Sequence, residues 1–168
     1  DGTRHGTAAV ADAPGLLVAF VCNHCPYVVH VAEDLGRLAQ DWTSRGLVVL
    51  GVNSNDTGAY PADAPAKMPG FAAANGWTFP YLVDETQEVA RAYRAACTPD
   101  FFLFDADRAL VYRGQLDDSR PSNGLPVTGE DLRAAIEAVL SGEPVSEDQR
   151  ASIGCSIKWR AGNEPAYG

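Results

Sequence analysis

The sequence predicts an α/β fold with a central mixed sheet and helices on both faces. Two apolar runs, residues 16–21 and 47–52, have the length and composition of strands that are buried on both faces. Segments with apolar residues at helical spacing follow these runs, which favours parallel strands joined by helical crossovers. Two further apolar segments flank a polar turn at residues 105–108 and predict an antiparallel hairpin at the end of the sheet.

The N-terminal half alternates strands and helices. Residues 1–14 are polar and have room for a short edge strand before the first buried strand. Apolar residues then recur at helical spacing from Pro26 to Trp42, and Gly46 stands at the expected end of that helix. The second buried strand runs into a polar loop at residues 53–56, as the end of a parallel strand commonly does.

The middle of the chain predicts shorter elements. A second helix is expected over residues 65–76, with Pro65 near its first position and Gly76 after its end. The Pro69-Gly70 pair must lie close to the first turn, or the helix is shorter. A strand at residues 79–83 and an amphipathic helix at residues 86–93 follow.

The C-terminal part predicts the hairpin, a last helix and a tail. The hairpin strands are residues 101–104 and 109–112. Thr128 and Asp131 resemble a capping box that opens a helix through Leu140, which ends at Gly142. We expect one domain over residues 1–142 and a tail over residues 143–168 that packs on or near it, through an apolar cluster at Ile153, Cys155, Ile157 and Trp159.

The composition of the chain limits the classes of partner that the protein is expected to bind. The chain has 22 acidic and 13 basic residues and a net charge of -9, so we expect neither nucleic acid nor an anionic membrane as a partner. The longest apolar run is far shorter than the roughly 20 residues that span a bilayer. Residues 1–15 lack the basic start and apolar core of a signal peptide, and four cysteines are too few for a disulfide scaffold. We therefore expect a cytoplasmic protein.

The strongest motif is Cys22-Asn23-His24-Cys25-Pro26, directly after the first buried strand. Free amides and the helix dipole at a helix N-terminus stabilise a thiolate, the nucleophile of thiol–disulfide exchange. We expect Cys22 to be the exposed attacking thiol and Cys25 to resolve the mixed disulfide. A protonated His24 would stabilise the Cys22 thiolate further, which favours the dithiol and makes the disulfide a stronger oxidant.

With these residues the chain resembles the thioredoxin superfamily, and more narrowly its peroxiredoxin-like branch of alkyl hydroperoxide reductase/thiol-specific antioxidant proteins. Besides the CxxC unit, the resemblance rests on residues 51–56, 97–100 and 154–159. The resemblance implies a thioredoxin-like fold without a bound cofactor. It also implies a cis peptide bond before Pro99, with the Thr98 backbone free to pair with an extended substrate peptide. Separately, the stabilised thiolate at the motif predicts a Cys22–Cys25 potential that is more oxidising than that of thioredoxin.

Two departures separate the chain from close members of these groups. Leu16 stands where thioredoxin has a buried acid six residues before its first cysteine. True peroxiredoxins place a threonine three residues and a proline seven residues before the reactive cysteine, and neither Cys22 nor Cys25 has this pattern. The missing pattern argues against a fast peroxidase.

A zinc site is a weaker interpretation of the CxxC motif than a redox pair. Cys97 and Cys155 each have two open interpretations. Zinc would need two more ligands, and all three histidines lie before residue 31, so we expect no metal. Cys97 is equally well read as an auxiliary thiol close to the CxxC or as a small buried hydrophobe. For Cys155 a buried thiol that anchors the tail is favoured over an auxiliary thiol, because only a tail that folds back brings it near.

The sequence thus predicts a thiol–disulfide oxidoreductase with an antioxidant role. It would reduce disulfides or hydroperoxides and take electrons from a thioredoxin- or glutathione-type thiol reductant. The rival from another class is a non-enzymatic thiol sensor or interaction domain that uses the same pair as a switch.

Overall fold

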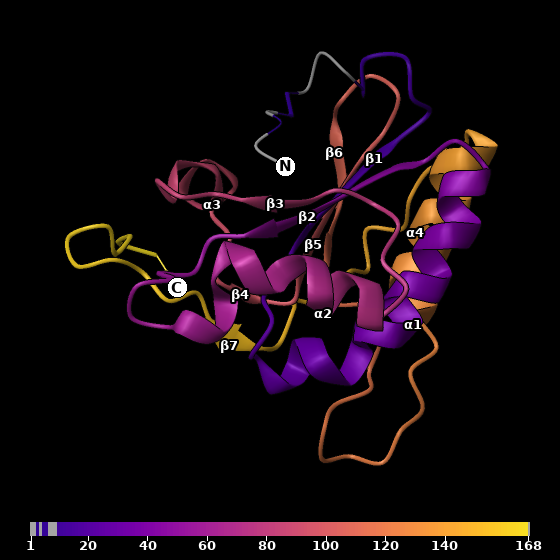
Figure 1. Ribbon diagram of the computed structural model, residues 1–168. Helices are drawn as coiled ribbons and strands as arrows, with labels where there is room; N and C mark the ends of the chain where they lie inside the picture. Colours follow the sequence, from indigo (N-terminus) through magenta and orange to yellow (C-terminus); the bar gives the residue numbers. More distant parts are fainter. Residues whose placement is uncertain (1–2, 4, 7–9, 168) are drawn as a thin grey trace.

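A five-stranded mixed sheet forms the centre of the computed structural model, which describes residues 3, 5–6 and 10–167 (Figure 1). The strand order is β3-β2-β1-β5-β6. The first three strands are parallel and the last two are antiparallel, so the predicted fold class is confirmed. Their bounds are β1 Leu16–Phe20, β2 Val48–Asn53, β3 Tyr81–Val83, β5 Asp100–Phe104 and β6 Leu110–Gly114.

Helices flank the sheet, and a second small sheet lies apart from it. The small sheet pairs β4, Cys97–Thr98, with β7, Cys155–Ser156, in antiparallel register. None of the helices in the described residues has the length and apolarity needed to cross a membrane. The helices and 3₁₀ turns are α1 Pro26–Ser44, η2 Pro61–Asp63, η3 Pro65–Lys67, α2 Met68–Ala74, α3 Glu88–Tyr93 and α4 Glu130–Ser141.

Strand β1 lies in the middle of the sheet and is buried along its whole length. Because successive side chains point to opposite faces, Leu17 and Ala19 pack in the cluster that includes α1 and α4. Leu16, Val18 and Phe20 pack on the other face, where α3 lies. The loop that follows β1 is therefore attached to the most enclosed strand of the fold.

Four expected elements differ from the structure. The helix over 65–76 is shortened: a 3₁₀ turn precedes it, and α2 begins at Met68, just before Pro69. Strand β3 is shorter than residues 79–83, and α3 is shorter than residues 86–93. The edge strand expected within residues 1–14 falls partly outside the described residues, and the described part contains no strand.

The start of α4 is held by a residue other than the predicted capping box. Gly129 occupies the N-cap position with φ +69°. The Thr128 hydroxyl accepts a hydrogen bond from the Glu130 N–H at 3.3 Å, but Asp131, the other residue of the predicted box, accepts from the Gln115 amide. The carboxylate of Asp117 instead accepts hydrogen bonds from the backbone N–H of Thr128 and Gly129, both at 2.6 Å. The predicted stop at Gly142 is confirmed, since this residue follows the helix with φ +71°.

The C-terminal segment runs across three parts of the molecule. The Arg150 carbonyl first accepts a hydrogen bond from the Gln115 N–H next to β6. The chain then forms β7 on β4, close to the start of α1 (Figure 1). The Lys158 N–H finally donates to the side chain of Asn55, in the loop after β2, at 2.8 Å. Cys155 thereby comes to the same region as the CxxC motif.

Candidate active site

The two cysteines of the CxxC motif lie where β1 ends and α1 begins. Pro26 takes the first helical position, which makes Cys25 the N-cap residue. The free amides and the positive end of the helix dipole therefore lie closest to Cys25. Cys22 is 1% exposed and Cys25 is 0% exposed. The expectation of an exposed Cys22 just before the helix is wrong, because the helix starts three residues later and other segments cover both thiols.

Thr98 and Pro99 lie against the two thiols. The Thr98–Pro99 peptide bond is cis, as the resemblance implies. The Cys25 Sγ lies 3.2 Å from the Thr98 carbonyl oxygen, to which the protonated thiol donates. The Cys22 Sγ lies 3.5 Å from the Thr98 hydroxyl oxygen. Both sulfurs thus face the same residue from opposite ends of the motif.

The pKa values of the two thiols shift in opposite directions. The hydrogen bond from Cys22 lowers the pKa of Cys25 to about 4 against the opposing effect of burial, and Cys155, Thr98 and the Val28 N–H lower it further. The same hydrogen bond, burial and the nearby Asp63 charge raise the pKa of Cys22. The Thr98 carbonyl oxygen disfavours a negative charge on Cys25, whereas the hydrogen-bond donors just named favour that charge. These opposite directions, together with the N-cap position of Cys25, favour a negative charge on Cys25 over one on Cys22.

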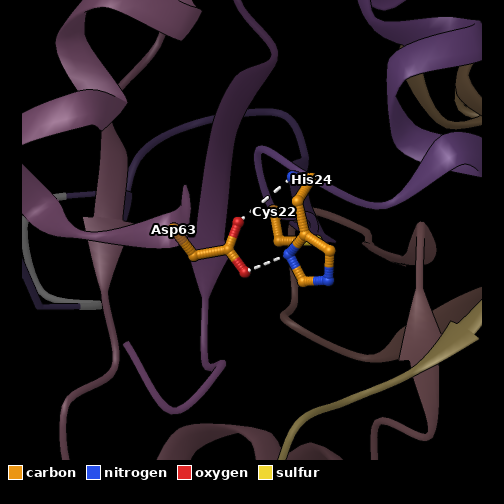
Figure 2. Close-up of side chains that lie close together, drawn as sticks. All are labelled: Cys22, His24 and Asp63. Carbon is orange, nitrogen blue, oxygen red and sulfur yellow. Dashed lines mark hydrogen bonds and ion pairs between the residues drawn. The ribbon is translucent and has the colours of Figure 1, made fainter. Parts of the chain in front are cut away.

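A buried carboxylate holds the loop between the cysteines. Asp63 is fully buried at the end of η2. Its Oδ1 accepts hydrogen bonds from the backbone N–H of Asn23 at 2.8 Å and of His24 at 3.2 Å. Its Oδ2 lies 2.6 Å from the His24 Nδ1 and accepts from the Asn55 amide at 2.8 Å. Figure 2 shows the Asp63 carboxylate facing both the backbone and the ring of His24, with Cys22 beside them.

His24 is oriented by this carboxylate. Because an ionised carboxylate only accepts hydrogen bonds, the His24 Nδ1 carries a hydrogen atom toward Asp63. The ring also stacks on Tyr60, with centroids 5.4 Å apart, and its side chain is 28% exposed. The nearby Asp63 charge raises the pKa of Cys22. The tuning of a Cys22 thiolate by His24 stays a prediction.

The side chains of Cys22, His24 and Asp63 form the one group with metal-ligand spacing in the described chain, with donor atoms within 4.8 Å of one another. The His24 Nδ1 and the Asp63 Oδ2 are 2.6 Å apart, which is a hydrogen-bond distance. Two ligands about 2.0 Å from a tetrahedral zinc would lie roughly 3.3 Å apart. The Asp63 oxygens also accept three other N–H groups. We interpret this group as a hydrogen-bonded support for the thiols.

Sequence reasoning missed Asp63, although a signal was present. Parallel strands β1 and β2 end at the same edge of the sheet, so the polar loop after β2 must lie beside the CxxC loop after β1. A carboxylate in the segment that follows β2 is therefore well placed to accept N–H groups of the CxxC loop. The sequence spacing alone, 39 residues between His24 and Asp63, gives no indication of this contact.

Cys97 is close to the pair, but its surroundings favour a protonated thiol. Burial and the Asp100 carboxylate, together with the charge on Cys25, raise its pKa to about 12. Its Sγ lies 3.7 Å from the Pro99 carbonyl oxygen, to which the thiol donates. Of the two open interpretations, this environment supports a partly buried structural thiol.

Cys155 stands across the ladder from Thr98, because the tail folds back onto β4. Its thiol lies close enough to Cys25 for the two groups to change each other's pKa. The tail thus folds back, as the auxiliary-thiol alternative requires, and the same pairing of β7 with β4 holds the tail on the domain. The expectation that the Thr98 backbone is free for a substrate peptide is wrong, since β7 pairs with it and Thr98 is 3% exposed.

The low pKa of Cys25 predicts a thiolate that survives in mild acid. The reduced protein should show the ultraviolet absorbance of one thiolate at neutral pH, and this absorbance should fall as the pH drops through about 4. The C25S variant should lack this step, because burial and the Asp63 charge still raise the pKa of Cys22 when Cys25 is absent. A step near the ordinary cysteine pKa of about 8.5 would contradict the charge assignment.

Solved structures of high similarity carry no assigned activity. A hypothetical protein from Sinorhizobium meliloti 1021 is 54% identical, with a TM-score of 0.90, covering 92% of this chain and 85% of that one. An uncharacterized conserved protein from Geobacillus kaustophilus is 58% identical, with a TM-score of 0.85, covering 89% of this chain and 78% of that one. The fold is therefore shared with proteins from these two bacteria.

More distant structures share the thioredoxin-like fold. A thiol-disulfide isomerase from Corynebacterium glutamicum is 19% identical, with a TM-score of 0.65, covering 83% of this chain and 89% of that one. No curated protein matches the chain. The family model for AhpC/TSA matches residues 1–113, which contain β1, the CxxC motif and cis-Pro99. The chain belongs to the AhpC/TSA family.

Proposed function

We propose that this protein is a thiol oxidoreductase that uses the Cys22–Cys25 dithiol to reduce disulfides or hydroperoxides. The observation that carries the proposal is a pair of buried thiols at the start of α1 that both contact Thr98, beside the cis-proline, with Cys25 at the helix N-cap. Family membership supports the same chemistry. The proposal assigns the first attack to Cys25, in place of the Cys22 expected from the sequence.

With a disulfide substrate, the Cys25 thiolate attacks one substrate sulfur. A mixed disulfide forms at Cys25, and the other substrate sulfur leaves as a thiolate that takes up a proton. Cys22 then loses its proton and attacks the Cys25 sulfur. The Cys22–Cys25 disulfide forms and the second substrate thiol is released, so the substrate is reduced by two electrons.

With a hydroperoxide, the Cys25 thiolate attacks the terminal oxygen of the O–O bond. Cys25 becomes a sulfenic acid, and the rest of the peroxide leaves as an alcohol, or as water when the substrate is hydrogen peroxide. The Cys22 thiol attacks the sulfenic sulfur, which forms the disulfide and releases water. Small substrates are favoured in this route, because both thiols are buried.

The cycle needs a thiol reductant and no bound cofactor. Two reductant thiols, of the thioredoxin or glutathione type, convert the Cys22–Cys25 disulfide back to the dithiol and become a disulfide themselves. Thr98 and Pro99 are proposed to position the substrate sulfur, since the Thr98 carbonyl and hydroxyl already contact the two thiols. His24 and its partner Asp63 are proposed to hold the loop in shape.

The function is tested by oxidising the reduced protein with one equivalent of hydrogen peroxide or of glutathione disulfide. Samples are alkylated over time, and the peptides are identified by mass spectrometry. We expect a Cys22–Cys25 disulfide with either oxidant, and renewed thiols on addition of thioredoxin or glutathione. The faster oxidant indicates the substrate class. Oxidation without turnover under any reductant would favour the thiol sensor instead.

A further inference from the structure

The tail strand β7 occupies the position that an extended substrate would be expected to take. Thr98 pairs with Cys155, and Cys97 pairs with Ser156, in antiparallel register. The pairing continues past the strand, where the Ile157 N–H donates to the Ala96 carbonyl at 3.2 Å. A segment of the chain itself thus lies along the backbone beside the CxxC thiols, and it brings a cysteine with it.

Gly154 lets this segment approach the site. A Cβ atom at this residue would lie 2.0 Å from the Thr98 carbonyl oxygen and 2.6 Å from the Thr98 carbonyl carbon. Real side chains do not tolerate such contacts with backbone atoms, so a residue without a Cβ is needed here. The close approach places the following residue, Cys155, next to Cys25.

The three neighbouring thiols differ in their access to solvent. Cys22 and Cys25 are buried, whereas Cys155 is only half-buried. A protein reductant, whose attacking thiol must reach a sulfur in line with the bond that it breaks, meets Cys155 first. The buried disulfide of the proposed function therefore lacks a direct contact with a large electron donor.

We infer that Cys155 is a third redox thiol, which carries reducing equivalents from a protein dithiol to the buried Cys22–Cys25 disulfide. This inference rests on the proposed function, because it requires that disulfide to form. It makes β7 an internal exchange segment as well as an anchor for the tail. Its two supports are the β4–β7 register, which sets Cys155 opposite Thr98, and the contact of Thr98 with both CxxC thiols.

The transfer is an internal thiol–disulfide exchange. Cys155 loses its proton and attacks the Cys25 sulfur of the Cys22–Cys25 disulfide. The Cys25–Cys155 bond forms, the Cys22–Cys25 bond breaks, and Cys22 leaves with the electron pair and takes up the proton. No external oxidant or reductant is consumed in this step.

A protein dithiol then completes the reduction. Its first thiolate attacks the Cys155 sulfur, and Cys25 leaves as a thiolate. Its second thiol attacks the reductant sulfur of the mixed disulfide, so that Cys155 is released and regains its proton. The reductant ends as a disulfide, and the protein again holds three reduced groups at Cys22, Cys25 and Cys155.

The charges in the site favour an attack by Cys155 after the Cys22–Cys25 disulfide has formed. In the reduced protein, burial, the hydrogen bond with Cys25 and the charge on Cys25 together raise the pKa of Cys155 to about 11, while Lys158 opposes them. Once Cys25 is part of a disulfide, its charge is gone and the thiol-to-thiolate hydrogen bond is lost. Cys155 then becomes more acidic, just when its attack is needed.

Cys97 provides a matched control. It lies on the strand paired with β7, next to Thr98, and is partly buried. Its thiol donates to the Pro99 carbonyl, and no hydrogen bond joins it to Cys25 among the described interactions. Replacing Cys97 by serine changes the number of cysteines without removing the proposed route.

The test uses variants of the full chain, with far-UV circular dichroism to confirm folding. C22S is oxidised with one equivalent of glutathione disulfide and digested without reduction. We expect a peptide pair linked through Cys25 and Cys155, equally abundant in C22S/C97S and absent from C22S/C155S. In a second arm the oxidised C155S protein is reduced by thioredoxin. We expect a rate at least about tenfold below that of the wild type and of C97S.

The outcomes separate this inference from the proposed function. If the wild type forms the Cys22–Cys25 disulfide but C22S gives no Cys25–Cys155 link, the proposed function stands and the role of Cys155 is overturned. Equal reduction of C155S and wild type by thioredoxin overturns it as well. If the wild type forms no Cys22–Cys25 disulfide, the proposed function itself fails.

Discussion

Replacing Cys25 by serine should abolish turnover with both disulfides and hydroperoxides. The loss should reach roughly three orders of magnitude or more, because removing a nucleophile leaves only binding contributions to catalysis. The serine hydroxyl stays protonated in the site where the Cys25 thiol has a pKa of about 4. The measurement is the rate of substrate reduction with a saturating thiol reductant.

Comparison with variants at Cys22 identifies the attacking thiol. C22S/C155S keeps Cys25 but has no neighbour that can resolve a mixed disulfide. It should retain the first attack and accumulate one glutathione on Cys25 when treated with glutathione disulfide. The matching C25S/C155S protein should take up little glutathione, because burial and the Asp63 charge still raise the pKa of the remaining Cys22. The reverse pattern would return the first attack to Cys22.

Replacing Gly154 by alanine should lift β7 from β4 and expose Cys25. The added methyl group would lie 2.0 Å from the Thr98 carbonyl oxygen, and overpacking of this kind costs about 1–3 kcal/mol or more. The two-residue ladder has few hydrogen bonds to resist it, each contributing about 1 kcal/mol. We expect alkylation of Cys25 in the reduced protein to become at least about tenfold faster.

The matched substitution for this prediction is Gly70→Ala. Gly70 lies in α2, and no atom lies within 4 Å of the position that a Cβ would take. Its alanine variant should therefore keep the wild-type alkylation rate. The double variant C22S/G154A should also lose most of the Cys25–Cys155 link, since Cys155 no longer lies beside Cys25. An unchanged alkylation rate in G154A would show that β7 does not limit access to the site.

The order and type of the main elements could be predicted from the sequence. The continuous apolar runs of β1 and β2 and the hairpin of β5 and β6 each have a local signature, and the predicted fold class is confirmed. The ends of helices and strands are harder to predict where they depend on residues distant in the sequence. The start of α4 is one such case, because Asp117, eleven residues before Thr128, accepts the N–H groups of Thr128 and Gly129 just ahead of the helix.

The candidate site could be predicted only where one short segment carries it. The CxxC motif and the proline before β5 are visible in the sequence, whereas the charge distribution between the thiols depends on the helix start and on Asp63. The place of Cys155 follows from a tail that folds back over more than fifty residues of sequence separation from β4. No periodicity or spacing encodes such a pairing, because it is fixed by a few hydrogen bonds and one close backbone approach.

The side chain of Asn55 sets a lower limit on how far the protein can be shortened. Its amide donates to Asp63, which holds the CxxC loop, and its carbonyl accepts the Lys158 N–H. A chain cut before residue 158 would keep every cysteine, yet it would leave the buried Asn55 carbonyl without this donor. An unpaired buried acceptor costs about 1–3 kcal/mol. This cost would arise next to Asp63, the carboxylate that supports His24. The residues beyond the last cysteine are therefore part of the smallest unit that can hold the dithiol in place.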